Sequence, residues 1–105
     1  MSIRIPHIIG GEEVHADGAT MDVTIPSTGA VRGTVGLADQ ALVDRAVANA
    51  KEAQKEWGAF SPLKRTRVLN EWIRLIRANA DDIARDLSLE HGKTFPDAHG
   101  DLQRG

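Results

Sequence analysis

The spacing of apolar residues changes once along this chain, near Asp39, and this change constrains the fold more than any other feature. Before Asp39, short apolar runs alternate with polar residues and are separated by turn sequences, which is typical of strands. After Asp39, apolar residues recur every three or four positions, as on one face of an α-helix. The sequence therefore predicts an α+β fold, with two β-hairpins in residues 1–37 and a helical part in residues 38–105.

Two turn sequences predict the hairpins. Gly10-Gly11-Glu12-Glu13 follows the apolar pair Ile8-Ile9, and Pro26-Ser27-Thr28-Gly29 precedes an alternating run from Val31 to Val35. Proline fixes φ for the first central position of a turn, and glycine accepts the positive φ that many turns require. Both sequences are therefore interpreted as turns that join neighbouring strands.

The first helix is predicted between Asp39 and Gly58. The Asp39 carboxylate suits an N-cap, because it accepts hydrogen bonds from otherwise unpaired backbone N–H groups, and Gly58 suits the residue that follows a helix end. Trp57 lies on the apolar face of this helix, and Trp72 lies on the apolar face of the next one. We expect both tryptophans to be core or packing residues rather than ligand platforms.

Ser61-Pro62 predicts the start of a second helix, because serine is a good N-cap and proline is tolerated in the first turn. The apolar stripe keeps its phase across residues 79–82, which predicts one helix or two nearly collinear helices with a kink there. Gly92 is the expected end. Thr94-Phe95-Pro96-Asp97 then predicts a further helix start.

Composition excludes several functional classes. The 105 residues carry 13 basic and 15 acidic side chains, a net charge of −2, so we expect no nucleic-acid partner. No apolar run is long enough to span a bilayer or to act as a secretory signal, so we expect no membrane association and a cytoplasmic location. Because cysteine is absent, the chain itself cannot supply a thiolate zinc site or a cysteine nucleophile.

Three residue groups resemble binding motifs without matching them. The basic residues of the second helix are interrupted by acids, which favours a solvated face over a phosphate-binding one. The four histidines lack the spacing of a helical metal motif, so we predict no metal site. Gly92-Lys93-Thr94 follows a helix rather than a strand, so we reject a phosphate-binding loop.

The order of these segments resembles the N-terminal part of the aldehyde dehydrogenase superfamily. The matching residues are Ile8-Ile9-Gly10-Gly11-Glu12, Pro26-Ser27-Thr28-Gly29, Arg45-Ala46-Val47, Ala50, Trp57, Arg65-Thr66-Arg67-Val68-Leu69 and Glu90-His91-Gly92-Lys93. The stretch from Glu90 to Gly105 is similar to the methylmalonate-semialdehyde dehydrogenase branch. The resemblance implies a parent enzyme with an α/β fold, of which this chain is an N-terminal segment with an incomplete cofactor domain.

That branch is NAD-dependent and CoA-acylating, and it oxidises malonate or methylmalonate semialdehyde to an acyl-CoA. The resemblance implies NAD and CoA in the parent enzyme, with no catalytic and no cofactor-binding residue in this chain. It also implies that Arg104 binds the carboxylate of the semialdehyde substrate. A guanidinium suits that role because it is permanently charged and can bind both carboxylate oxygens.

Two other interpretations remain open. The chain could be a fragment of a different aldehyde dehydrogenase branch, or a non-catalytic truncated module. The apolar helical stripes have few surfaces to cover them in so short a chain, and large exposed apolar patches mark interfaces. We therefore expect a homo-oligomer.

Overall fold

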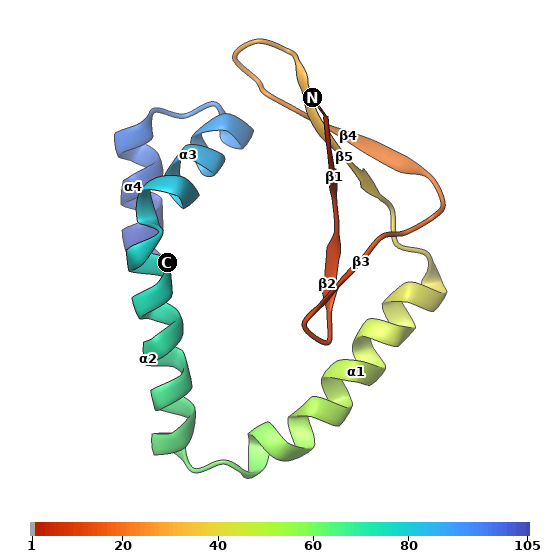
Figure 1. Ribbon diagram of the computed structural model, residues 1–105, viewed down its shortest axis with the longest axis vertical. Helices are drawn as coiled ribbons and strands as arrows, with labels where there is room; N and C mark the ends of the chain where they lie inside the picture. The colour runs from red at the N-terminus through yellow and green to blue at the C-terminus, as the bar shows by residue number, and fades with distance from the viewer. Residues whose placement is uncertain (1) are drawn as a thin grey trace. The chain divides into compact units, whose positions relative to one another are not determined.

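The computed structural model describes residues 2–105 and shows the α+β fold that the sequence predicts (Figure 1). The chain forms two compact units. The first contains the residues up to Val23 together with Val31–Phe60, and the second contains Thr24–Ala30 together with Ser61–Gly105. None of the helices in residues 2–105 combines the length and the apolar composition needed to cross a membrane.

Five short strands precede the helices. They are β1 (Ile3–Ile5), β2 (His7–Ile9), β3 (Glu12–Val14), β4 (Thr20–Thr24) and β5 (Val31–Gly36). They form a three-stranded sheet in the order β1-β5-β4 and a separate two-stranded sheet of β2 and β3.

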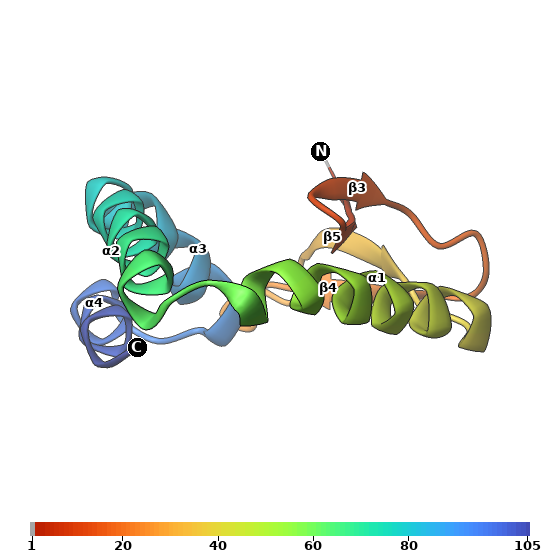
Figure 2. The ribbon, with the colours of Figure 1, turned by 90° about the horizontal axis from the view of Figure 1, so that it is seen from below.

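The predicted hairpin at Gly10-Gly11 is confirmed. Strands β2 and β3 are antiparallel, with Ile8 opposite Glu13, and both glycines have positive φ angles of 63° and 79°. The turn lies close to the first helix (Figures 1 and 2). A Cβ atom at Gly10 would be only 3.0 Å from Asn49 Nδ2.

The second predicted hairpin is also confirmed, with β4 and β5 as hydrogen-bonded neighbours. Its turn is closed by the Ile25 N–H, which donates to the Ala30 carbonyl oxygen over 2.8 Å. Gly29 has a φ of 74°, which glycine adopts without the steric cost that other residues incur.

Strand β1 was not expected from the sequence. It runs parallel to β5, with Ile3 opposite Gly33 and Ile5 opposite Val35. The two backbones approach so closely that a Cβ atom at Gly33 would lie 2.6 Å from the Ile3 carbonyl oxygen. A glycine inside a strand indicates this kind of close approach.

Helix α1 (Gln40–Ala59) begins as predicted, with the Asp39 carboxylate accepting a hydrogen bond from the Leu42 N–H over 2.8 Å. The predicted end at Gly58 is wrong, because Gly58 lies inside the helix and has no positive φ. Phe60 follows the helix as its C-cap: its N–H donates to the Trp57 carbonyl oxygen, and its backbone is extended. An extended exit leads directly into the Ser61 cap of the next helix.

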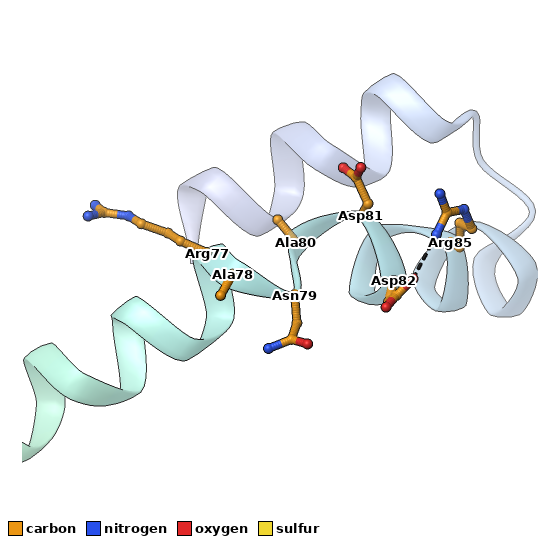
Figure 3. Close-up of a pocket in the computed structure, with 7 residues that line it drawn as sticks. All are labelled: Arg77, Ala78, Asn79, Ala80, Asp81, Asp82 and Arg85. Carbon is orange, nitrogen blue, oxygen red and sulfur yellow. Dashed lines mark hydrogen bonds and ion pairs between the residues drawn. The ribbon is translucent and has the colours of Figure 1, made fainter.

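The predicted kink separates α2 (Pro62–Ala78) from α3 (Ala80–His91). Asn79 leaves helical geometry at φ −112° and ψ 18°, and its side-chain amide donates to the Leu75 carbonyl oxygen instead of capping α3. The axis changes direction there, so the two helices are not collinear (Figure 3). Gly92 ends α3 in the left-handed region, and α4 (Phe95–Arg104) follows.

The buried core of residues 2–105 is small and consists of Ala16, Ala84 and Ala98. Neither α1 nor α2 buries a residue. Of the two roles expected for the tryptophans, core or packing residue, neither tryptophan has the core role in residues 2–105: Trp57 is 36% exposed and Trp72 is 60% exposed. Trp57 still packs against Phe60, with ring centroids 5.9 Å apart.

Candidate functional site

The α3–α4 hairpin positions the candidate site. Gly92 has a φ of 84°, which reverses the chain after α3, and the Thr94 hydroxyl caps α4 by accepting a hydrogen bond from the Asp97 N–H. Ala84 of α3 and Ala98 of α4 are completely buried. Small side chains let two helices approach closely, so these alanines set the helices side by side.

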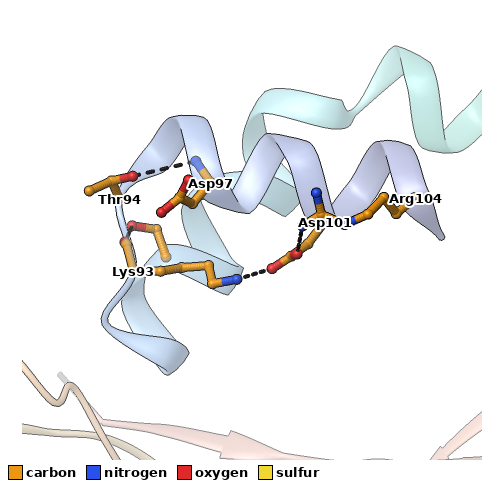
Figure 4. A network of polar contacts seen from close by, with 6 residues as sticks. Lys93, Thr94, Asp97, Asp101 and Arg104 are labelled. Carbon is orange, nitrogen blue, oxygen red and sulfur yellow. Dashed lines mark hydrogen bonds and ion pairs between the residues drawn. The ribbon is translucent and has the colours of Figure 1, made fainter.

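Lys93, Asp101 and Arg104 form a hydrogen-bonded group, called here the Asp101 cluster (Figure 4). Lys93 Nζ donates to Asp101 Oδ2, and Arg104 Nη2 donates to Asp101 Oδ1. The Lys93 side chain is 21% exposed and the Asp101 side chain 32%, whereas the Arg104 side chain is 72% exposed. The cluster therefore extends from the α3–α4 connection to the solvent at the end of α4.

The electrostatics of the cluster keep Asp101 ionised. The hydrogen bond from Lys93 lowers the pKa of the Asp101 carboxyl below its ordinary value, and the hydrogen bond from Arg104 lowers it further. Two cations and one carboxylate leave one net positive charge. Since arginine has five N–H donors, the cluster can present further donors to an anion.

Arg104, which the resemblance assigns to substrate binding, thus lies in the last turn of α4 and contacts Asp101. Lys93 and Asp101 were not predicted as site residues. The Asp101–Arg104 spacing of three residues on a helix is a sequence signal for a pair. The Lys93–Asp101 contact has no such signal, because it depends on how the chain reverses between α3 and α4.

The contacts of Lys93 and Thr94 agree with the rejection of a phosphate-binding loop. The Lys93 ammonium binds Asp101, and its carbonyl oxygen accepts a hydrogen bond from Ser88 Oγ over 2.6 Å. The Thr94 hydroxyl caps α4. Both residues therefore stabilise the helix hairpin.

A concave region lies at the junction of α2 and α3 (Figure 3). This hollow has a volume of about 410 Å³ and is lined by Arg77, Ala78, Asn79, Ala80, Asp81, Asp82 and Arg85. Arg85 Nη1 donates to Asp82 Oδ1 over 2.7 Å, and His99 Nε2 lies 2.8 Å from Asp81 Oδ1. Its charges are balanced and paired in part with one another, so it selects for neither anions nor cations.

The histidines are dispersed, and no group of three potential metal-binding side chains occurs among residues 2–105. His7 Nε2 donates to the Gly36 carbonyl oxygen over 2.7 Å, while His99 contacts Asp81. His99 also packs edge-on against the Phe95 ring, with centroids 4.9 Å apart.

Three of the helix N-termini among residues 2–105 differ from the pyrophosphate site of a dinucleotide such as NAD. That site requires a glycine-rich turn from a strand into a helix, with open N–H groups at the helix N-terminus. The one helix that follows a strand here, α1, has the Asp39 carboxylate at its N-terminus. Asp81, Asp82 and Asp97 place negative charge in the first turns of α3 and α4, where a phosphate would be repelled.

The sequence was compared with known proteins. The profile of the Aldehyde dehydrogenase family matches residues 14–105. Malonate-semialdehyde dehydrogenase of Halalkalibacterium halodurans is 39% identical over 103 residues, which make up 97% of this chain and 21% of that protein.

Solved structures agree. The methylmalonate-semialdehyde dehydrogenase of Oceanimonas doudoroffii superimposes with a TM-score of 0.93 at 36% identity, covering 99% of this chain and 21% of that one. A Sinorhizobium meliloti protein assigned as a methylmalonate-semialdehyde dehydrogenase, solved with NAD, gives a TM-score of 0.91 at 40% identity, covering 96% of this chain and 21% of that one. The chain thus spans about a fifth of the length of the relatives it matches. Since the family profile covers most of its residues, the chain belongs to the aldehyde dehydrogenase family.

Proposed function

We propose that this chain is the N-terminal segment of an NAD-dependent, CoA-acylating malonate- or methylmalonate-semialdehyde dehydrogenase. The names of its relatives support this substrate class, and the related structures include complexes with NAD. The chain covers only about a fifth of those relatives, which supports a longer parent enzyme.

The other parts of the parent enzyme supply the covalent and cofactor chemistry in this proposal. The resemblance to the family implies acyl transfer through a cysteine nucleophile, and this chain contains no cysteine. The carboxylates at the N-termini of α1, α3 and α4 support NAD binding by other segments as well. The contribution of residues 1–105 is therefore substrate recognition rather than bond making.

The observation that carries the proposal is the exposed guanidinium of Arg104, which Asp101 binds through one nitrogen. A semialdehyde of this class bears a carboxylate, and a guanidinium can bind both of its oxygens. A charge-assisted hydrogen bond contributes roughly 1.5–3 kcal/mol. An uncharged aldehyde gains nothing from this contact, so Arg104 would act on specificity.

The test is Arg104→Leu in the full-length enzyme. We expect kcat/KM for malonate semialdehyde to fall about ten- to a hundredfold, because the substrate carboxylate loses its partner. Turnover of propionaldehyde should stay nearly unchanged. Arg74→Leu is the matched control, since Arg74 also pairs with an acid three residues before it but lies on α2. An equal loss on both substrates would assign Arg104 a structural role and remove the support for this branch.

A second candidate is self-association, supported by the exposed apolar side chains of α1 and α2. Val43, Val47, Val68, Leu69, Trp72 and Ile73 are all more than 40% exposed. Burial of such surface drives association. We therefore propose a homo-oligomer, and we expect sedimentation of the 105-residue chain to show dimers or larger species. A stable monomer at high micromolar concentration that unfolds cooperatively would contradict this candidate.

A further inference from the structure

The Asp101 cluster differs from the other acid–arginine pairs of the same spacing. Asp82–Arg85 and Glu71–Arg74 also join residues three apart on one helix, over 2.7 Å in both pairs. Those pairs carry no net charge. In the Asp101 cluster, Lys93 binds the second carboxylate oxygen and restores a net positive charge.

We propose that Asp101 is a positioning residue that orients Arg104 toward the substrate carboxylate, with Lys93 as its anchor. This inference rests on the proposed function of Arg104. It concerns specificity between carboxylated and uncharged aldehydes, and it assigns Asp101 no contact with the substrate.

The Arg104 side chain needs such an orienting contact. An arginine side chain loses many rotamers when it is held in one place, and 72% of this one is exposed to solvent. The Asp101 carboxylate holds Nη2, and the guanidinium lies over Gly100, with Nη1 3.4 Å from the place of a Cβ atom there. The side chain is therefore folded back along α4 rather than extended.

Asp101 is itself fixed from outside its helix. Lys93 lies in the connection between α3 and α4, and its side chain is the least exposed of the three. Its carbonyl oxygen accepts a hydrogen bond from Ser88, which ties the connection to α3. A chain of hydrogen bonds through Asp101 and Lys93 thus fixes the position of the Arg104 guanidinium relative to the α3–α4 hairpin.

Lys93 also removes the electrostatic penalty of an acid beside an anion site. Without it, the Asp101 carboxylate would cancel the charge of Arg104 and repel a second carboxylate. With it, the cluster keeps one net positive charge. Asp101 can therefore orient Arg104 while the cluster still attracts an anionic substrate.

The experiment is Asp101→Ala in the full-length enzyme, alone and combined with Arg104→Leu. The alanine variant leaves two cations without an acid, so charge alone would lower KM for malonate semialdehyde. Positioning predicts the opposite: a rise in KM of about three- to tenfold, with kcat and all propionaldehyde constants unchanged. In the Arg104→Leu background, Asp101→Ala should then have no further effect. Asp82→Ala is the matched control.

The outcomes separate this inference from the proposed function. If Arg104→Leu shows no selective loss, the proposed function is wrong. If Arg104→Leu is selective but Asp101→Ala lowers KM, leaves it unchanged or affects both aldehydes equally, the positioning role is wrong. Should Asp101→Ala fail to fold, Lys93→Met takes its place. It should raise KM for the carboxylated substrate alone, again only when Arg104 is present.

Discussion

Helix α2 and the α3–α4 hairpin belong to the same compact unit but differ in how far their apolar side chains are buried. Helix α2 carries the large apolar side chains Leu69, Trp72 and Ile73, yet none of its residues is buried and Trp72 is 60% exposed. The hairpin buries only small side chains, but Ala84 and Ala98 have no exposed surface. Side-chain hydrophobicity therefore does not decide burial in this chain; the presence of a packing partner does.

Helix α3 packs against α4, which follows it directly in the sequence. Among residues 2–105, α2 has no packing partner with a contact of similar size. Three residues, 92–94, connect α3 to α4, so closing the hairpin costs little chain entropy. A single helix of the length of α2 is only marginally stable in water without tertiary contacts. We therefore expect substitutions in the hairpin to affect this chain more than substitutions on the α2 face.

The largest effect is expected from Ala84→Leu. Ala84 is 0% exposed, so the added methyl groups must separate α3 from α4, at a cost of about 1–3 kcal/mol. Hydrogen exchange of the α4 amides should accelerate by about tenfold or more. The measurement is residue-resolved exchange on the 105-residue chain.

Trp72→Ala is the contrasting variant. Trp72 is mostly exposed in the single chain, so at concentrations low enough to keep the chain monomeric, removing this large side chain should change α2 stability by less than about 0.5 kcal/mol. The α1 amides, in the other compact unit, are the internal reference for both variants. A larger effect from Trp72→Ala than from Ala84→Leu would show that α2 is packed in solution and would remove the contrast.

Local signals in the sequence were sufficient for most element boundaries. The Gly10-Gly11 turn, the Ser61 and Asp39 caps and the Gly92 helix end were predicted, because each depends on backbone conformation or on hydrogen bonds within a few residues. Gly58 was misassigned because a glycine near a helix end suits a left-handed exit, whereas the chain leaves α1 extended at Phe60.

Features that join distant residues could not be predicted. Strand β1 has three residues and pairs with the distant strand β5, with Ile3 opposite Gly33, so its own sequence carries little signal. Gly33 is the one residue whose identity hints at that pairing. In the site, Arg104 was identified through the family resemblance, whereas Lys93 and Asp101 meet only because the α3–α4 hairpin closes.

The smallest expected effect concerns acid titration, and it compares α2 with the hairpin directly. The hydrogen bond from Arg74 lowers the pKa of Glu71, and hydrogen bonds from Lys93 and then Arg104 lower that of Asp101. A carboxyl whose pKa is lower in the folded state adds stability that is fully present above its unfolded value. That stability begins to decline as the pH falls below about 3.8, the ordinary pKa of the Asp101 carboxyl, and it is fully lost only below the lowered folded value.

The Glu71 and Asp101 carboxyls differ in where their hydrogen-bond partners lie, and this difference can be tested by measuring their titration midpoints. Glu71 is held within α2, whereas Asp101 is held mainly by Lys93, which lies outside α4. Lys93→Met should therefore raise the titration midpoint of Asp101 toward 3.8, more than Arg104→Leu does, and leave the Glu71 midpoint unchanged. Carboxyl-carbon NMR of the 105-residue chain measures both midpoints in one titration. Arg104→Leu could instead shift the Asp101 midpoint more than Lys93→Met does. The main partner of Asp101 would then lie within its own helix, as it does for Glu71. The contrast between α2 and the hairpin would not hold for these two carboxyls.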